Sequence, residues 1–245
     1  MLYKEYFNEI EGLLTQVESS QSDTIEQAAE LIADCMEAGG IVHVFGSGHS
    51  HMMAEELYHR AGGLVPISAM LDPNLSSFGL LKSSALERKE GYAEVVLDTY
   101  GVRSGEVLIV VSNSGINPVP VEMALGGKQR GAKVIAVTSA SNYADVPSRM
   151  SDGARLAEVA DLVFDTHVPR GDAVIELEGL AVKTGAASTI VGAALLNATM
   201  VEVVHILQDR GIEPPVLKSQ NVPGGDDWNK ELIERYRSRL PLLKR

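Results

Sequence analysis

The sequence predicts an α/β fold with three layers, in which helices cover both faces of a parallel β-sheet. Two observations support this prediction. The apolar runs are short, aliphatic and continuous rather than alternating, as in strands buried on both faces. Helical segments of about 10–20 residues separate the runs, which is typical of parallel strands joined by crossover helices. The expected strands are residues 41–45, 65–68, 107–111, 133–138 and 162–165.

The expected helices follow from apolar residues at helical spacing and from capping residues. A first helix is expected at 1–19, and Ser22 or Asp23 would cap a second at 23–38. Further helices are expected at 50–61, 92–100, 118–130, 142–150, 177–209 and 227–238, and a loop with helical turns at 69–91. We expect one domain over 1–245, with a helical N-terminal extension (1–38), a core (39–210) and a C-terminal tail (211–245).

The composition argues against several classes of function. The chain has 245 residues and a formal net charge of −12. We therefore expect neither nucleic acid, whose binding needs a basic face, nor an anionic membrane surface as a partner. No run of 18 apolar residues is present, so no membrane span is expected. The single cysteine, Cys35, is expected to be a buried structural thiol, and a chain without disulfides indicates a reducing cytoplasm.

Two strands end in turns of small residues, and these turns are the most informative feature of the sequence. Gly46-Ser47-Gly48-His49-Ser50 follows the strand at 41–45, and Ser112-Asn113-Ser114-Gly115 follows the strand at 107–111. A strand that turns into a helix at such residues leaves unpaired N–H groups and a positive dipole end, which together bind phosphate. Ligands of parallel sheets bind at the carboxyl ends of strands. Two such turns predict a ligand with one phosphate and several hydroxyls.

Other phosphate and catalytic loops fit these turns poorly. The first turn lacks the third glycine of a dinucleotide fingerprint, and the next strand does not end in an acidic residue. The chain has no Gly-Lys-Ser/Thr of a P-loop and no Gly-x-Ser-x-Gly nucleophile elbow. The ordinary alternative is that both turns are strand–helix connections with serine caps.

At these residues the chain resembles the sugar isomerase (SIS) domain family, over about residues 20–210. The two turns and the following strand 134–138 are similar to the family signatures, and the chain is most similar to phosphoheptose isomerases and to uncharacterised relatives of this length. The resemblance implies a flavodoxin-like, five-stranded parallel sheet, phosphosugar binding and oligomers with sites between subunits. It implies that phosphate is held by Ser47, Ser50, Ser112, Ser114 and Thr138 or Ser139, within the site Gly46–Ser50, Ser112–Gly115 and Thr138.

Conversion of an aldose phosphate to a ketose phosphate needs a base and an acid next to the carbonyl, usually His or Glu. His205 lies in the apolar segment Val203-Val204-His205-Ile206-Leu207, and phosphoheptose isomerases carry a catalytic histidine in a similar context. Asn197, eight residues earlier on the same helical face, takes the place of their glutamine and is expected to contact the substrate. The alternative for His205 is a core histidine bonded to the backbone.

The helix after the first turn carries further candidates. His51, Glu55 and His59 recur every four residues and would share one helical face, which is feasible geometry for zinc. The alternative is a solvated or subunit-facing polar stripe, and no cofactor is our leading expectation. Phosphoheptose isomerases place a histidine and a glutamate further along this helix, where ungapped counting gives Glu56 and Arg60 here. Glu55 or Glu56 is therefore the expected acid–base partner.

Three other acidic residues and one tail segment are weaker candidates. Glu87 lies in the segment 69–91, which is long enough to close over a ligand as a lid. Glu176 and Glu178 would begin the helix at 177–209 as ordinary capping residues. Residues 219–226 are rich in amides and glycine, and we expect them to fold back onto a neighbouring site, anchored by Trp228.

The leading functional prediction is a cytoplasmic phosphosugar isomerase that acts by proton abstraction next to the carbonyl. Its partner is a small sugar phosphate, and a homodimer or homotetramer is expected. Two alternatives stay open: a lyase or dehydratase acting on an amino-sugar phosphate such as N-acetylglucosamine 6-phosphate, and a sugar-phosphate sensor without catalysis.

Overall fold

The five predicted strands form one parallel sheet in the order β2-β1-β3-β4-β5. The structure, a computed structural model, describes residues 1–79 and 81–243. Leu80 in the predicted loop and the last two residues of the predicted tail lie outside the described residues. Runs of β-branched residues form these strands because they pack well on a pleated, buried surface. Their bounds are β1 Val42–Gly46, β2 Ile67–Met70, β3 Val107–Val111, β4 Lys133–Thr138 and β5 Leu162–Asp165.

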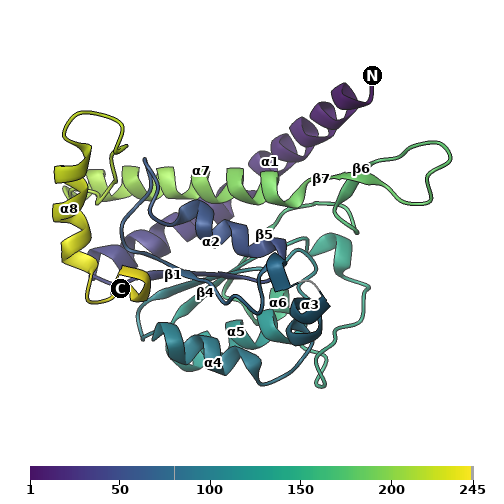
Figure 1. The fold of residues 1–245 in the computed structure, drawn as a ribbon, viewed down its shortest axis with the longest axis horizontal. Coiled ribbons are helices and arrows are strands. Elements are labelled where there is room, and N and C mark those ends of the chain that lie inside the picture. The colour runs from purple at the N-terminus through teal and green to yellow at the C-terminus, as the bar shows by residue number, and fades with distance from the viewer. Residues whose placement is uncertain (80, 244–245) are drawn as a thin grey trace.

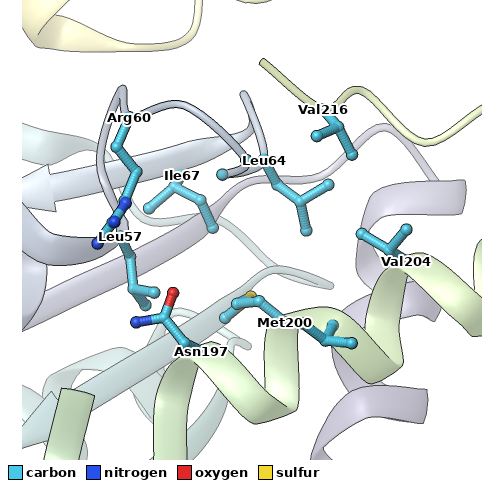
Figure 2. A pocket seen from close by; sticks show the side chains of 11 residues that line it. Leu57, Arg60, Leu64, Ile67, Asn197, Met200, Val204 and Val216 are labelled. Carbon is cyan, nitrogen blue, oxygen red and sulfur yellow. The ribbon is translucent and has the colours of Figure 1, made fainter. Parts of the chain in front are cut away.

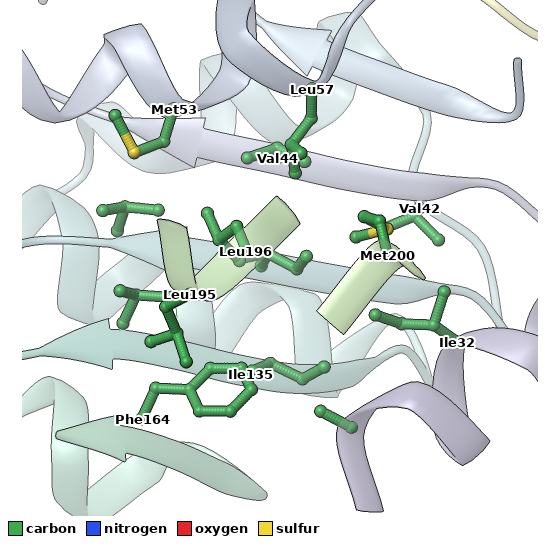
Figure 3. Close-up of a cluster of buried hydrophobic side chains, with 14 of the residues drawn as sticks. Ile32, Val42, Val44, Met53, Leu57, Ile135, Phe164, Leu195, Leu196 and Met200 are labelled. Carbon is green, nitrogen blue, oxygen red and sulfur yellow. The ribbon is translucent and has the colours of Figure 1, made fainter. Parts of the chain in front are cut away.

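Helices cover both faces of the sheet, which confirms the three-layer α/β prediction (Figure 1). On one face lie α1 (Leu2–Glu37), α2 (Met52–Leu57) and α7 (Ser188–Asp209), and on the other lie α4 (Tyr92–Tyr100), α5 (Pro118–Gln129) and α6 (Leu156–Val159). Leu195, Leu196 and Met200 of α7 cover the sheet, as Figure 3 shows. The remaining helical elements are η1 (His49–His51), η2 (Ser77–Gly79), α3 (Leu81–Glu87), η3 (Ser141–Tyr143), α8 (Gly225–Tyr236) and η4 (Pro241–Leu243).

The N-terminal region forms one continuous helix, α1, instead of the two predicted helices. Gln21, at the expected break, is buried, and its side-chain oxygen accepts a hydrogen bond of 3.0 Å from the Asp165 N–H. This tertiary contact outweighs the weak preference of Ser22 and Asp23 for a cap. The N-terminal end of α1 projects beyond the rest of the fold, beside the β6–β7 hairpin (Figure 1).

The predicted helix at 177–209 is wrong in its first eleven residues. Strands β6 (Ala173–Ile175) and β7 (Thr184–Ala186) form an antiparallel hairpin there, and α7 begins only at Ser188. Gly179 and Gly185 have φ values of +81° and +80°, which no right-handed helix allows. Asp172, which lies outside α7, stabilises the first turn of this helix: its carboxylate accepts hydrogen bonds from the Ser188 N–H and hydroxyl over 2.7 and 2.8 Å.

Other differences are shorter. Helix α2 ends at Leu57 rather than at residue 61, the predicted helix at 142–150 is only the turn η3, and α6 was not predicted. Strand β2 begins two residues later than expected because Val65 pairs with the tail: its N–H donates to the Pro215 carbonyl over 3.0 Å. The sequence explains this only in retrospect, since the partner is 150 residues away.

The C-terminal tail packs against the sheet as a third small core. Leu217, Leu232 and Leu240 of the tail lie buried with Ile41 and Val65, which precede β1 and β2. Cys35 is buried as expected, and burial raises the pKa of its thiol to about 11. One helix in the described residues, α7, is long and apolar enough to cross a membrane by length and composition alone, with a mean hydropathy of 1.8, although no span was predicted. In this fold α7 is one of the helices that cover the sheet.

Candidate functional site

The two turns of small residues lie side by side. Strand β1 pairs with β3, and Gly46 is in register with Val111, so the turns that follow these residues begin at the same level of the sheet. Strand β4 pairs with the other side of β3, which brings Thr138 to the same edge. The topology therefore gathers the predicted segments Gly46–Ser50 and Ser112–Gly115 with Thr138.

The first turn is tightly closed. A Cβ atom on Gly46 would lie 2.3 Å from the Ser50 carbonyl oxygen, so the close approach of this turn requires glycine. The N–H groups of Gly48 and Ser50 already donate to the carbonyls of Leu75 and Ser47 over 2.8 and 3.0 Å. The turn then enters the 3-10 helix η1 rather than an α-helix. It thus offers fewer free N–H groups than its sequence predicts, and its hydroxyl groups become more important.

The second turn is shaped by Gly115, which has a φ of +61°. Its N–H donates to the Ser112 hydroxyl over 3.2 Å, and the Thr138 hydroxyl donates to the Asn113 carbonyl over 3.3 Å. Helix α5 begins only at Pro118, whose ring nitrogen carries no hydrogen. Ser114, in the middle of this turn, is half-buried.

Between the turns is a small cavity with unpaired polar atoms. Among the described residues, three buried side-chain atoms have no hydrogen-bond partner, and two of them, Asn113 Oδ1 and Thr166 Oγ1, belong to residues that line this cavity. Buried polar atoms are normally paired, so these two atoms have hydrogen-bonding capacity left for a polar group that enters the cavity. Its lining also includes His49, Ser50, Ser188 and Thr189. The cavity measures about 20 Å³, room for about one water molecule, so a phosphate enters only if neighbouring side chains shift.

Thr166 was missed by the sequence analysis. It directly follows β5 and is buried at the same carboxyl edge of the sheet as the two turns. Its position was available in the sequence, because the rule that ligands bind at the carboxyl ends of parallel strands applies to the last strand too. Glycine residues mark the other two turns in the sequence, and Thr166 has no neighbouring glycine to mark it in the same way.

Helix α3 brings Glu87 to the first turn. The Ser47 hydroxyl donates a hydrogen bond of 2.7 Å to Glu87 Oε1. Both side chains are at least half-buried, and the bond joins residues 40 positions apart. The segment 69–91 was expected to cover a ligand, and it places a carboxylate against a predicted phosphate-binding hydroxyl.

Asn197 and Glu56 lie together, but not at the cavity between the turns. The Asn197 side-chain N–H donates to Glu56 Oε1 over 2.9 Å, and Arg60 forms an ion pair with the same carboxylate. Asn197 and Arg60 line an apolar cavity of about 190 Å³ (Figure 2). Its lining includes Leu57, Leu64, Ile67, Met200, Val204 and Val216, none of which lines the cavity between the turns.

Comparison with known proteins places the chain in a family. Residues 5–139 match the model of the SIS domain. The chain belongs to the SIS domain family. It is 45% identical over 239 residues to the UPF0309 protein BH0227 of Halalkalibacterium halodurans, covering 97% of this chain and 96% of that protein. It is 40% identical over 240 residues to a UPF0309 protein of Geobacillus thermodenitrificans, covering 98% and 96%.

Solved structures with the same fold include two phosphoheptose isomerases. GmhA from Neisseria gonorrhoeae has a TM-score of 0.55 at 20% identity, covering 84% of this chain and 100% of that one. The enzyme from Francisella tularensis has a TM-score of 0.53 at 17% identity, covering 82% and 95%. These likenesses establish the SIS fold of the chain.

In this SIS-domain chain, His205 is remote from the cavity between the turns. It lies about 20 Å along the axis of α7 from Gly192, which lines that cavity. Its side chain is 61% exposed, and its Nε2 is 3.6 Å from the Asp209 carboxylate. His205 is therefore neither a buried core histidine nor part of a site with the two turns of its own chain.

The three residues considered as an alternative zinc site do not converge. His51 Nε2 lies 3.3 Å from Glu55 Oε1, and His51 Nδ1 forms a hydrogen bond with the Gly48 carbonyl. His59 lies beyond the end of α2, with a φ of +47°, so it does not share the helical face of the other two. Across residues 1–79 and 81–243, no group of three His, Cys, Asp or Glu side chains is arranged to hold a metal. Glu176 and Glu178 lie in the hairpin rather than at a helix start.

A buried charged network lies near the start of β3, away from the turns. Glu106 accepts hydrogen bonds from His43 over 3.0 Å and from the Arg103 N–H over 2.8 Å, and Arg239 of the tail forms an ion pair with it. Burial alone would raise the pKa of Glu106, but the bonds from His43 and Arg239 lower it below its ordinary value. This network ties the tail to the sheet.

Proposed function

We propose that the protein is an enzyme that binds a sugar phosphate at the two turns and removes a proton next to the sugar carbonyl, converting an aldose phosphate to a ketose phosphate. The observation that carries the proposal is the register of β1 with β3, which sets the two turns beside the unpaired atoms of Asn113 and Thr166. A ligand with one anionic end and several hydroxyls matches this mixture of donors and acceptors.

The hydroxyl groups would hold the phosphate. Ser47, Ser50, Ser114 and Thr138 would supply short donors from three adjacent strand ends. Ser47 and Thr138 would first turn their hydroxyls away from Glu87 and from the Asn113 carbonyl. Short side chains lose little entropy when they bind, so they can bind a dianion without lysine. Asn113 and Thr166 have one unpaired oxygen each, and these would contact the sugar hydroxyls.

Glu87 is the acid–base group that the geometry favours. A phosphate at the first turn competes with the Glu87 carboxylate for the Ser47 hydroxyl, so Glu87 would shift from Ser47 toward the attached sugar. There it would take the proton from C2 of the aldose while the carbonyl oxygen O1 takes a proton from water, which gives the enediol. It would then return its proton to C1 while the C2 hydroxyl gives its proton to water and becomes the new carbonyl. The net result moves the carbonyl from C1 to C2.

The roles of His205, Glu55 and Glu56 would depend on assembly. The resemblance implies sites between subunits, and the exposed His205 ring is free to approach the turns of a second copy in a homodimer or homotetramer.

Two structural neighbours are described as phosphoheptose isomerases, enzymes whose name specifies a phosphorylated sugar. The activity in their names supports a sugar phosphate as the substrate class.

A two-step experiment tests the function. A panel of hexose, heptose and N-acetylhexosamine phosphates is screened by thermal shift, because a bound ligand raises the melting temperature. Each ligand is then followed by proton NMR in heavy water, where isomerisation incorporates deuterium next to the carbonyl. We expect Ser114→Ala to reduce the thermal shift, while Ser19→Ala, on the exposed face of α1, leaves it unchanged.

Three outcomes would contradict the proposal. A vinylic signal would identify elimination, and tight binding without turnover would identify a sensor. A thermal shift that is equal in Ser114→Ala and in the wild-type protein would remove the turns from the binding site.

A further inference from the structure

A polar cavity forms where the tail meets the end of α2. Residues 62–63 and Leu217 are joined by antiparallel hydrogen bonds, from the Gly62 N–H to the Leu217 carbonyl over 2.8 Å and from the Leu217 N–H to the Gly63 carbonyl over 2.9 Å. The cavity measures about 220 Å³. This is below the roughly 300–1,000 Å³ of pockets for drug-sized ligands, so its ligand would be small.

Helix α8 supports the part of the tail that lines this cavity. The buried Asn229 side chain uses both ends of its amide, accepting from the Lys218 N–H and donating to the Lys218 carbonyl, each over 2.9 Å. The Trp228 indole N–H donates to the Val216 carbonyl over 2.9 Å. These bonds fix the backbone at Val216 and Lys218 before any ligand arrives, which lowers the cost of binding there.

The cavity gathers side chains that bind anions in a chain that is strongly acidic overall. It is lined by His59, Arg60 and Lys218 and by the amides of Gln220 and Asn221. Lys218 Nζ lies over the Trp228 ring, 4.0 Å from the ring centroid. Among the described residues, Lys218 has no carboxylate partner. Arg60, by contrast, forms an ion pair with the Glu56 carboxylate. Such a set suits a phosphate that is flanked by hydroxyl groups.

The backbone holds His59 in a costly conformation. Its φ of +47° lies in the left-handed region, which residues other than glycine adopt uncommonly, although histidine, asparagine and aspartate do so more often than the rest. Glycine would remove this strain, and Gly62 shows that the chain uses glycine where this conformation is needed nearby, with a φ of +79°. Strain retained at a polar cavity is a feature of ligand sites.

We propose that this cavity is a second anion site, which binds a small phosphorylated metabolite between Lys218, His59 and the amides of Gln220 and Asn221. It shares no lining residue with the cavity between the two turns. The inference does not depend on the proposed function, because it rests on the tail and not on the strand ends. It gives a role to the amide-rich segment at 219–226, which the sequence predicted to fold back onto a site.

Binding of inorganic phosphate and of glucose 6-phosphate, followed by calorimetry on the full-length protein, tests this site. Lys218→Met keeps the apolar stem against Trp228 and removes the charge. We expect it to weaken phosphate binding at least about fivefold. Lys230→Met, an exposed change on α8, is the matched control and leaves binding unchanged. Ser114→Ala alters the turns and leaves the binding that depends on Lys218 intact.

A second variant protects the test against simple loss of folding. His59→Gly relieves the backbone strain, so we expect a higher melting temperature together with weaker phosphate binding. Gln220→Ala is expected to reduce any preference for glucose 6-phosphate over inorganic phosphate. The proposal fails if wild-type protein binds no phosphate at concentrations up to about 10 mM. It also fails if Lys218→Met and His59→Gly bind like the wild type, or if Ser114→Ala removes all binding.

Discussion

The hydroxyl of Ser47 donates a 2.7 Å hydrogen bond to the carboxylate of Glu87. This contact places a negative charge where the sequence predicts a phosphate. Removing the charge of Glu87 should therefore have opposite effects on ligand binding and on turnover. A carboxylate next to a bound dianion weakens its binding, whereas the same carboxylate is needed if it transfers the proton.

Glu87→Gln separates these two effects. We expect tighter binding of a substrate phosphosugar, by at least about threefold, because the repulsive charge is gone. We expect turnover to fall by about 10²–10⁴-fold, the usual contribution of a general acid–base group. Calorimetry and a turnover assay measure the two quantities. Glu178→Gln, which removes an equal charge from the exposed hairpin, should change neither, and full activity of Glu87→Gln would exclude Glu87 as the proton carrier.

The unpaired Thr166 hydroxyl leads to a prediction about stability without ligand. Thr166→Val replaces a buried hydroxyl that has no partner, so the free energy of unfolding should be unchanged or rise by up to about 1 kcal/mol. Thr199→Val is the matched control: its buried hydroxyl donates to the Leu195 carbonyl over 2.9 Å, and its loss should cost about 1 kcal/mol. Urea denaturation measures both. A clear loss of stability in Thr166→Val would show that water or another group already satisfies this hydroxyl.

Gly46 should not tolerate a side chain. A Cβ atom would lie 2.3 Å from the Ser50 carbonyl oxygen, so Gly46→Ala forces the first turn to open. We expect a loss of about 2 kcal/mol or more in stability, with a reduced thermal shift by sugar phosphates. Gly12→Ala, within α1 and with no atom within 4 Å of the new methyl group, should instead add about 0.5–1 kcal/mol. Equal stability of the two variants would contradict the geometry of the turn.

The ion pair between Glu106 and Arg239 predicts a pH dependence. The pKa of Glu106 is lowered from its ordinary value of 4.5, so its contribution to stability is complete above that value and is lost as the pH falls below it. Arg239→Ala should destabilise the protein at pH 7 by about 1–3 kcal/mol and make the acid loss shallower. Urea denaturation at neutral and acid pH tests this. Arg235→Ala, which breaks an exposed pair with Glu231, should cost less than about 0.5 kcal/mol.

The projecting end of α1 predicts assembly. Phe7 is 68% exposed and Tyr3 59% exposed there, and apolar surface of this kind is typical of protein interfaces. We expect a homodimer or homotetramer by light scattering, and Phe7→Glu should shift it toward monomer. Val95→Glu, which charges a 59% exposed valine on α4, should leave assembly unchanged. A monomeric wild-type protein would refute the prediction and leave His205 without a partner site.

The sheet could be predicted from sequence because its strands are marked locally. Residues 107–111, 133–138 and 162–165 form strands with the expected bounds, since continuous aliphatic runs have few other stable environments. The hairpin at 173–186 was misread because Leu, Glu and Ala favour helix, while the positive φ of Gly179 and Gly185 is set by tertiary structure.

The candidate site was predictable only in part. The two strand-end turns were predicted from sequence, and the pairing of β1 with β3, which the structure supplies, brings their hydroxyls to one edge of the sheet. The bond between Ser47 and Glu87 spans 40 residues and has no local signature. His205 was selected from its apolar neighbours, but one helical face carries those neighbours to the core while the histidine points outward.

The small core shared by Ile41, Val65 and the leucines of the tail has a consequence for biosynthesis. The first two strands leave the ribosome before the tail leucines that complete their packing have been made. Until Leu240 is synthesised, an apolar patch beside β1 and β2 stays open to solvent. A nascent chain stalled before the tail should therefore bind chaperones that recognise exposed apolar segments.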